Sequence, residues 1–189
     1  PKRTIRIGLW GGEEQGLLGS AHLAAHLPLP SGRIAANINI DGLNLLGRTR
    51  DLVAIGQGKS SLDDYVTALA RMQQRSVVPD PFPDRGSFYR SDQLNFARIG
   101  VPAAYVKSGT DVIGKPAGWG LQKRAEYAAN DYHKPSDDVK ADWDLAGAVE
   151  DGQMLFEVGY RIAQSSKWPE WKPGTEFKAK REAMLKKQQ

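Results

Sequence analysis

The chain has 189 residues, 40% of them hydrophobic and 25% charged, which is typical of a globular domain with a substantial core. It has no cysteine, which excludes disulfides, thiolate metal ligands and cysteine nucleophiles. The net charge is +4, but six of the 26 Lys and Arg and only two of the 22 Asp and Glu fall within residues 172–189. The rest of the chain is therefore balanced, so we expect no nucleic-acid partner. No apolar run approaches the ~20 residues that cross a membrane, so we expect no transmembrane segment.

In the first half of the chain, the sequence pattern predicts strands that alternate with helices. Expected strands are residues 5–10, 34–40 and 52–56. Expected helices are residues 17–27, which Pro28 and Pro30 end, and a segment after the N-capping residue Ser60. The apolar face of this second helix is expected to contain Leu62, Val66, Leu69 and Met72.

The second half continues the alternation. We expect a loop over residues 77–90, with a brief extended stretch at residues 77–78, followed by a helix over 92–99 and a strand over 101–106. A long glycine-rich loop is expected over residues 108–131. The last expected helix covers residues 143–164, and its apolar residues are Leu145, Val149, Leu155, Val158 and Ile162. This alternation predicts an α/β, three-layer sandwich in which a mixed, mainly parallel sheet is flanked by helices. We expect residues 1–166 to form the domain and residues 167–189 to form a basic C-terminal tail, helical and solvated.

Acidic residues follow two of the predicted strands. Glu13 and Glu14 follow residues 5–10, and Asp41 follows residues 34–40. Open α/β sheets bind ligands at the carboxyl ends of their strands, so these carboxylates are expected to meet. Adjacent side chains on an extended backbone point to opposite sides, so one glutamate can bind a metal while the other takes a proton.

The chain has only three histidines. His22 and His26 have the i, i+4 spacing of a helical metal site, but position 23 is Leu where a His-Glu-x-x-His protease needs Glu. His133 follows the long loop and precedes Pro135, which restricts the backbone before it. From the residue alone, a metal ligand and an ordinary surface histidine are both open interpretations.

Four stretches, in order, carry a resemblance to a known family. They are residues 10–20 with Glu-Glu-x-Gly-Leu-x-Gly-Ser, residues 39–41 with Asn-Ile-Asp, residues 89–103 with Tyr-Arg-Ser-Asp near their start, and residues 132–137 with Tyr-His-x-Pro-Ser-Asp. They resemble the zinc aminopeptidases that include bacterial leucyl aminopeptidase and aminopeptidase Y. Relatives of that family are glutamate carboxypeptidase, glutaminyl cyclase and the inactive transferrin receptor. The resemblance implies a phosphorylase/hydrolase-like fold, a peptide substrate and two zinc ions.

The resemblance also implies roles for seven residues. Glu13 is expected to be the general base, Glu14 a zinc ligand, and Asp41 and His133 ligands of different zinc ions, while Ser91, Asp92 and Tyr132 are expected on the substrate side. Tyr132 or Tyr105 is a candidate donor to the oxyanion. Position 93 departs from the family, which commonly has His where this chain has Gln.

The family also uses a histidine and a bridging aspartate from an earlier His-x-Asp segment, which these residues lack. We therefore expect the C-terminal portion of a catalytic domain, with the N-terminal part missing, inactive alone and pairing with that part or with another copy. The expected location is extracytoplasmic, from the resemblance only. Two alternatives stay open: a non-catalytic scaffold module of the same fold, and a glutaminyl-cyclase-like acyltransferase with one zinc.

Overall fold

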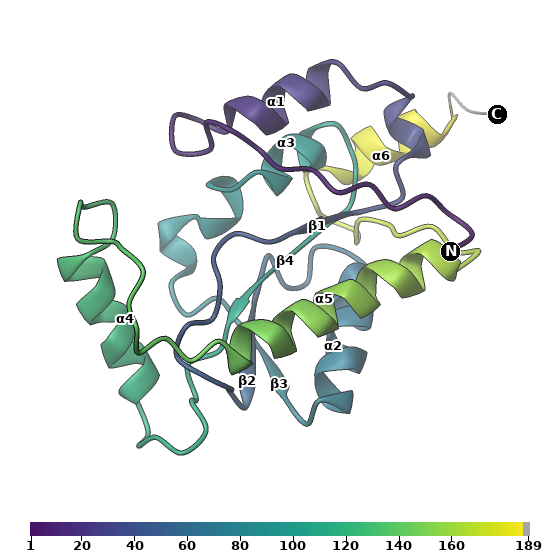
Figure 1. Cartoon of the computed structure of the whole chain (residues 1–189). Helices are drawn as coiled ribbons and strands as arrows, with labels where there is room; N and C mark the ends of the chain where they lie inside the picture. Colours follow the sequence, from purple (N-terminus) through teal and green to yellow (C-terminus); the bar gives the residue numbers. More distant parts are fainter. Residues whose placement is uncertain (187–189) are drawn as a thin grey trace.

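A four-stranded sheet lies at the centre of the computed structural model, which describes residues 1–186 (Figure 1). The strand order is β1-β4-β2-β3, with β1/β4 and β2/β3 parallel and β2/β4 antiparallel. The predicted α/β fold with a mixed, mainly parallel sheet is confirmed. The strands are β1 (Asn37–Asn39), β2 (Asp51–Ile55), β3 (Ser76–Pro79) and β4 (Ala103–Ser108).

Helices lie on both faces of this sheet (Figure 1). The α-helices of the described residues are α1 (Leu18–Ala25), α2 (Leu62–Met72), α3 (Gln93–Arg98), α4 (Trp119–Asn130), α5 (Ala146–Gln164) and α6 (Lys178–Lys186). Short 3₁₀ helices are η1 (Ser31–Arg33), η2 (Pro83–Arg85) and η3 (Ser87–Tyr89).

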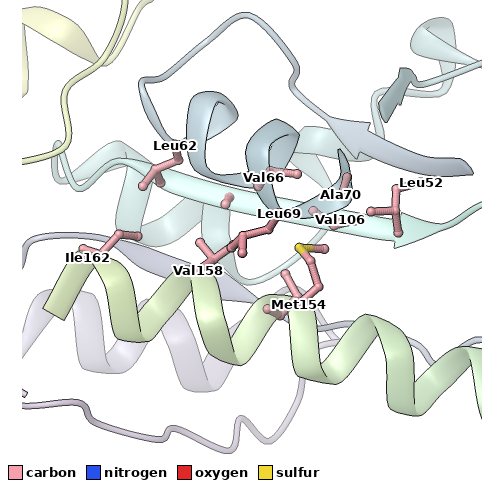
Figure 2. Close-up of a cluster of buried hydrophobic side chains, with 11 residues drawn as sticks. Leu52, Leu62, Val66, Leu69, Ala70, Val106, Met154, Val158 and Ile162 are labelled. Carbon is pink, nitrogen blue, oxygen red and sulfur yellow. The ribbon is translucent and has the colours of Figure 1, made fainter. Parts of the chain in front are cut away.

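One face of the sheet packs against α2 and α5. Successive strand residues point to opposite faces, so Leu52 of β2 and Val106 of β4 enter this core together. Figure 2 shows their side chains meeting those of the two helices. The buried helix residues are Leu62, Val66, Leu69 and Ala70 of α2 with Met154, Leu155, Val158 and Ile162 of α5.

The opposite face is covered by α3 and by the chain that follows α5. Val53 and Tyr105, from alternate strand positions, pack here with Trp171 and Phe177. The tail differs from the predicted solvated segment, because Arg181 of α6 is 2% exposed and donates to Ile34 O at 2.9 Å. The tail therefore forms part of the packed structure as far as residue 186, and residues 187–189 lie outside the described residues.

The strand predicted over residues 5–10 is not formed. The segment is extended but has no ladder partner among the described residues, because β1 pairs only with β4. Hydrogen bonds define a strand, so apolar alternation alone does not create one. Arg3 N donates to Ala163 O at 2.9 Å and the Trp10 ring packs on Phe96 at 5.7 Å, so both ends are anchored. Between them, Ile7 and Leu9 are 90% and 93% exposed.

Three further expectations need correction. The predicted loop over 108–131 contains the helix α4, because the glycines cluster before Trp119 and the residues after it favour a helix. Met72 ends α2 on its solvent side at 67% exposure. Leu145 and Val149, near the start of α5, are 49% and 58% exposed and do not belong to the buried core.

The helices of residues 1–186 include none that is both long enough and apolar enough to cross a membrane.

Candidate functional site

A tight glycine-containing turn presents Glu13 and Glu14 before α1. The amides of Gly16 and Leu17 both donate to Glu13 O, at 3.0 and 2.9 Å. Gly16 has φ 110°, which side chains rarely adopt, so glycine is required there. Gly19 approaches the backbone so closely that an added Cβ would lie 2.8 Å from Gly11 O. These glycines fold the chain back at once, leaving Glu14 exposed and Glu13 half-buried.

Asp41 follows β1 and is held by side chains from two other segments: Ser91, just before α3, and Tyr105 of β4. Ser91 Oγ donates to Asp41 Oδ2 at 2.5 Å, and Tyr105 Oη donates to the same oxygen at 3.2 Å. Asn39 Nδ2 donates to Ser91 Oγ at 2.8 Å. Burial, followed by the charge of Asp41, raises the pKa of Tyr105, so its phenol stays protonated as a donor. This network fixes the Asp41 carboxylate at the carboxyl end of β1.

His133 meets Glu14 across a long separation in sequence. His133 Nε2 lies 2.8 Å from Glu14 Oε1, a contact between residues 119 positions apart. Both side chains are exposed, at 48% and 59%. The turn before α1 and the loop after α4 thus bring a carboxylate and an imidazole into contact. Because the two residues are far apart in the sequence, this contact is a product of the fold and not of local chain geometry.

Asp92, the remaining predicted carboxylate, is buried between α1 and α3 and does not face solvent as Glu14 and His133 do. Ser20 Oγ of α1 donates to Asp92 Oδ1, and Asn95 Nδ2 of α3 donates to Ser20 Oγ at 2.9 Å. Asp92 is 7% exposed and Ser91 is 2% exposed. These residues therefore join the turn, α1 and α3 into one unit beneath the site.

The half-buried Glu13 feels every other carboxylate of this group. Burial raises its pKa, and the charges of Asp41, Glu14 and Asp92 raise it further, while His133 lowers it. The charges of Glu14, Asp41, Asp92 and His133, four of the predicted site residues, therefore all act on Glu13.

Tyr132 lies at the exposed edge of the group. Its ring stacks on the His133 imidazole with centroids 3.7 Å apart. Burial and the charge of Glu14 raise the pKa of Tyr132, while Arg90 lowers it. Tyr132 is 44% exposed and thus offers the site an accessible phenol.

The donor set can be compared with what zinc requires. Zinc binds imidazole nitrogen and carboxylate oxygen, and protein sites use three or four such ligands. Glu14 and His133 supply one of each, facing one another. In residues 1–186, however, no group of three or more His, Cys, Asp and Glu side chains is arranged to hold a metal. The donor types fit zinc, and the pair provides two ligands of a site that needs more.

Sequence reasoning did not identify Ser20 and Asn95 as partners of Asp92. The sequence offers only a weak indication of these partners: Asn95 is a polar residue three positions after Asp92, within a short helix whose other residues are mostly buried. Gln93, where the resembling family commonly has His, turns away to donate to Phe88 O at 2.7 Å. The pair His22 and His26 stacks ring on ring at 4.4 Å, apart from the hydrogen bonds of the site.

The fold and the donor types together indicate a class: an open α/β protein whose loops bring an exposed imidazole against a carboxylate, the donor types of a zinc-binding protein. Comparison with protein families then gives the particular family. The chain belongs to peptidase family M28, which matches residues 1–156. It is therefore a metallopeptidase of a zinc-dependent family that acts on peptides, and the predicted family resemblance is confirmed. A comparison with curated proteins found no match.

Proposed function

We propose that this chain carries the general base and part of the ligand set of a two-zinc aminopeptidase. Glu14 and His133 bind one zinc, Asp41 binds the other, and Glu13 is the base. The observation that supports this most strongly is the 2.8 Å contact between His133 Nε2 and Glu14 Oε1. Two zinc-type donors from distant parts of the chain face each other at the surface, where a metal and a substrate can reach them.

The chemistry follows from these positions. Zinc, when bound, supplies a Lewis acid for the peptide carbonyl and makes water acidic enough to react near neutral pH. Glu13 accepts a proton from the attacking water and delivers it to the leaving amine as the C–N bond breaks. Tyr132 donates a hydrogen bond to the developing oxyanion. Ser91 and Asp92 support the substrate side from beneath, because both are buried.

We further propose that the remaining zinc ligands come from polypeptide outside these 189 residues, either an N-terminal portion of the same catalytic domain or another copy. Two features support this. The pair Glu14 and His133 is short of a complete zinc site. The outer edge of β1 is unpaired among the described strands, and Ile7 and Leu9 of the preceding segment are exposed. Unpaired edges are where strands are added.

The test is a pair of glutamate-to-glutamine substitutions in the intact protein, followed by release of the N-terminal residue from peptides and by zinc content. Glu13→Gln is expected to abolish hydrolysis, by at least about 10²-fold as for other general bases, while zinc content stays unchanged. Glu14→Gln, the matched variant one position away, is expected to lower both. Turnover in Glu13→Gln would rule out the assigned base.

The same assay separates the alternatives. N-acetylated peptides should resist cleavage if the enzyme is an aminopeptidase and be cut if it acts from the carboxyl end. Release of pyroglutamate from an N-terminal glutamine would indicate the glutaminyl-cyclase-like reaction instead. Absence of any turnover with zinc bound would favour a scaffold module. An extracytoplasmic location is proposed from the family alone.

A further inference from the structure

The loop that carries His133 is attached to the last turn of α4 through one residue. The amides of Asp131 and Tyr132 both donate to Tyr127 O, at 2.9 and 3.0 Å. The chain then turns sharply, because the amide of Lys134 donates to Asp131 O at 2.9 Å. His133, inside this turn, has φ 59°, a left-handed conformation that is uncommon for a residue with a side chain.

The side chain of Tyr127 closes the same loop from its far end. Tyr127 Oη donates to Asp137 Oδ2 at 2.7 Å, across ten positions that include His133. This hydrogen bond raises the pKa of Tyr127 to about 12, so the phenol remains a donor at any ordinary working pH. Backbone and side chain of one residue therefore hold both ends of the turn.

Aromatic contacts carry this restraint to the imidazole. The ring of Tyr127 lies 5.9 Å from that of Tyr132, which in turn stacks on His133 at 3.7 Å. Tyr127 is 41% exposed and belongs to none of the buried core clusters. Its contacts are local to the loop, so their main consequence is the position of His133. A strained backbone persists only where its surroundings hold it in place.

We propose that Tyr127 and Asp137 are positioning residues, which hold the His133 loop closed so that Nε2 faces Glu14. The inference rests on the proposed function in one respect: the proposed function makes His133 a zinc ligand, and the positioning of its imidazole matters for that role. Neither residue touches the metal or the substrate in this account. Their effect acts entirely through the orientation of the imidazole.

The first readout needs no metal. The ring protons of His133, assigned by comparison with His133→Ala, should be shifted upfield by the stacked Tyr132 ring in the proton spectrum of the full chain. Tyr127→Phe keeps the ring but removes the hydroxyl, and Asp137→Asn weakens the acceptor. Both are expected to move these resonances toward the values of an unstructured histidine. Tyr160→Phe is the control and should change nothing: this tyrosine lies on α5, and among residues 1–186 its hydroxyl accepts from Gln164 alone.

The second readout is zinc affinity, measured by competition with a chelator. Tyr127→Phe and Asp137→Asn are each expected to weaken binding about tenfold, as substitutions behind a metal ligand do. Because both substitutions act on the same hydrogen bond, the double variant should be no weaker than Tyr127→Phe alone. Unchanged His133 resonances in Tyr127→Phe, or additive losses in the double variant, would overturn the inference.

The two proposals can fail separately. If His133→Ala binds zinc as tightly as the unaltered chain, the ligand assignment of the proposed function is wrong, whatever the resonances show. If His133→Ala loses zinc but Tyr127→Phe keeps both its affinity and its resonances, the ligand role stands and the positioning role is wrong. In a chain that binds no zinc at all, the resonances alone still decide the positioning role.

Discussion

Beneath the exposed Glu14 and His133, buried hydrogen bonds connect α1 to α3 and to the residue before it. Ser20 has no exposed surface, donates to Asp92 and accepts from Asn95. A buried polar group that loses its partner bears the full cost of desolvation. The hydroxyl of Ser20 therefore matters to the site although it touches neither Glu13 nor Glu14.

Ser20→Ala is expected to lower the free energy of unfolding by about 1–3 kcal/mol, because Asp92 and Asn95 lose a shared partner inside the fold. Denaturant unfolding measures this. The matched control is Ser166→Ala, at an exposed position, which should remain within about 0.5 kcal/mol of the unaltered chain. Equal stability of the two variants would show that the hydrogen bonds of Ser20 contribute nothing to folding.

At this scale the sequence could predict residue types but not their partners. Glu13, Glu14 and Asp41 were expected together because each follows a predicted strand, although the strand expected before the two glutamates is not formed. The charges of Asp41 and Glu14 raise the pKa of Glu13. The Ser91–Asp41 and Ser20–Asp92 hydrogen bonds could not be predicted, because they depend on how helices dock rather than on any local pattern.

Among the elements, α2 and α5 determine the more extensive apolar core. Their periodic apolar positions pack against the strand residues Leu52 and Val106 (Figure 2). Met154 of α5 is 1% exposed within this cluster, whereas Met72 at the end of α2 is 67% exposed. One residue type therefore occupies two very different environments.

The same substitution at both methionines tests this packing. Met154→Ala is expected to cost about 2–5 kcal/mol of unfolding free energy, because it removes buried apolar atoms and leaves a cavity. Met72→Ala should change the value by less than about 0.5 kcal/mol. Thermal or denaturant unfolding of the two variants gives the comparison, and a loss at Met72 as large as that at Met154 would contradict the core described above.

Helices and strands could be predicted from the sequence where the residues at the periodic apolar positions are also the ones that the fold buries. The apolar positions of α2 and the later part of α5 were correct because a neighbouring element covers them. Residues 5–10 show the opposite case: their alternation is typical of a strand, but a strand needs a hydrogen-bonded partner, and β1 does not pair with them. In α4 the preceding glycines obscured a helix that few buried residues mark.

At the scale of the whole molecule, the fold brings together site residues from Glu13 to His133, and the C-terminal tail packs against the sheet that carries them. Trp171 and Phe177 pack under β2 and β4, and Arg181 reaches the backbone just before β1. The tail thereby supports the strand that ends at Asp41. The charge pattern of residues 172–189 is typical of a solvated surface helix, so the sequence alone did not predict that this segment packs against the sheet.

The central claim is that Glu14 and His133, which the fold brings within 2.8 Å of each other, share one zinc ion. The most direct measurement is anomalous scattering at the zinc edge from crystals of the protein grown with zinc. The account predicts a peak bonded to both His133 Nε2 and a carboxylate oxygen of Glu14, at the ~2.0–2.2 Å typical of zinc ligands. Zinc bound elsewhere, or bound with Glu14 and His133 still in direct contact with each other, would contradict it.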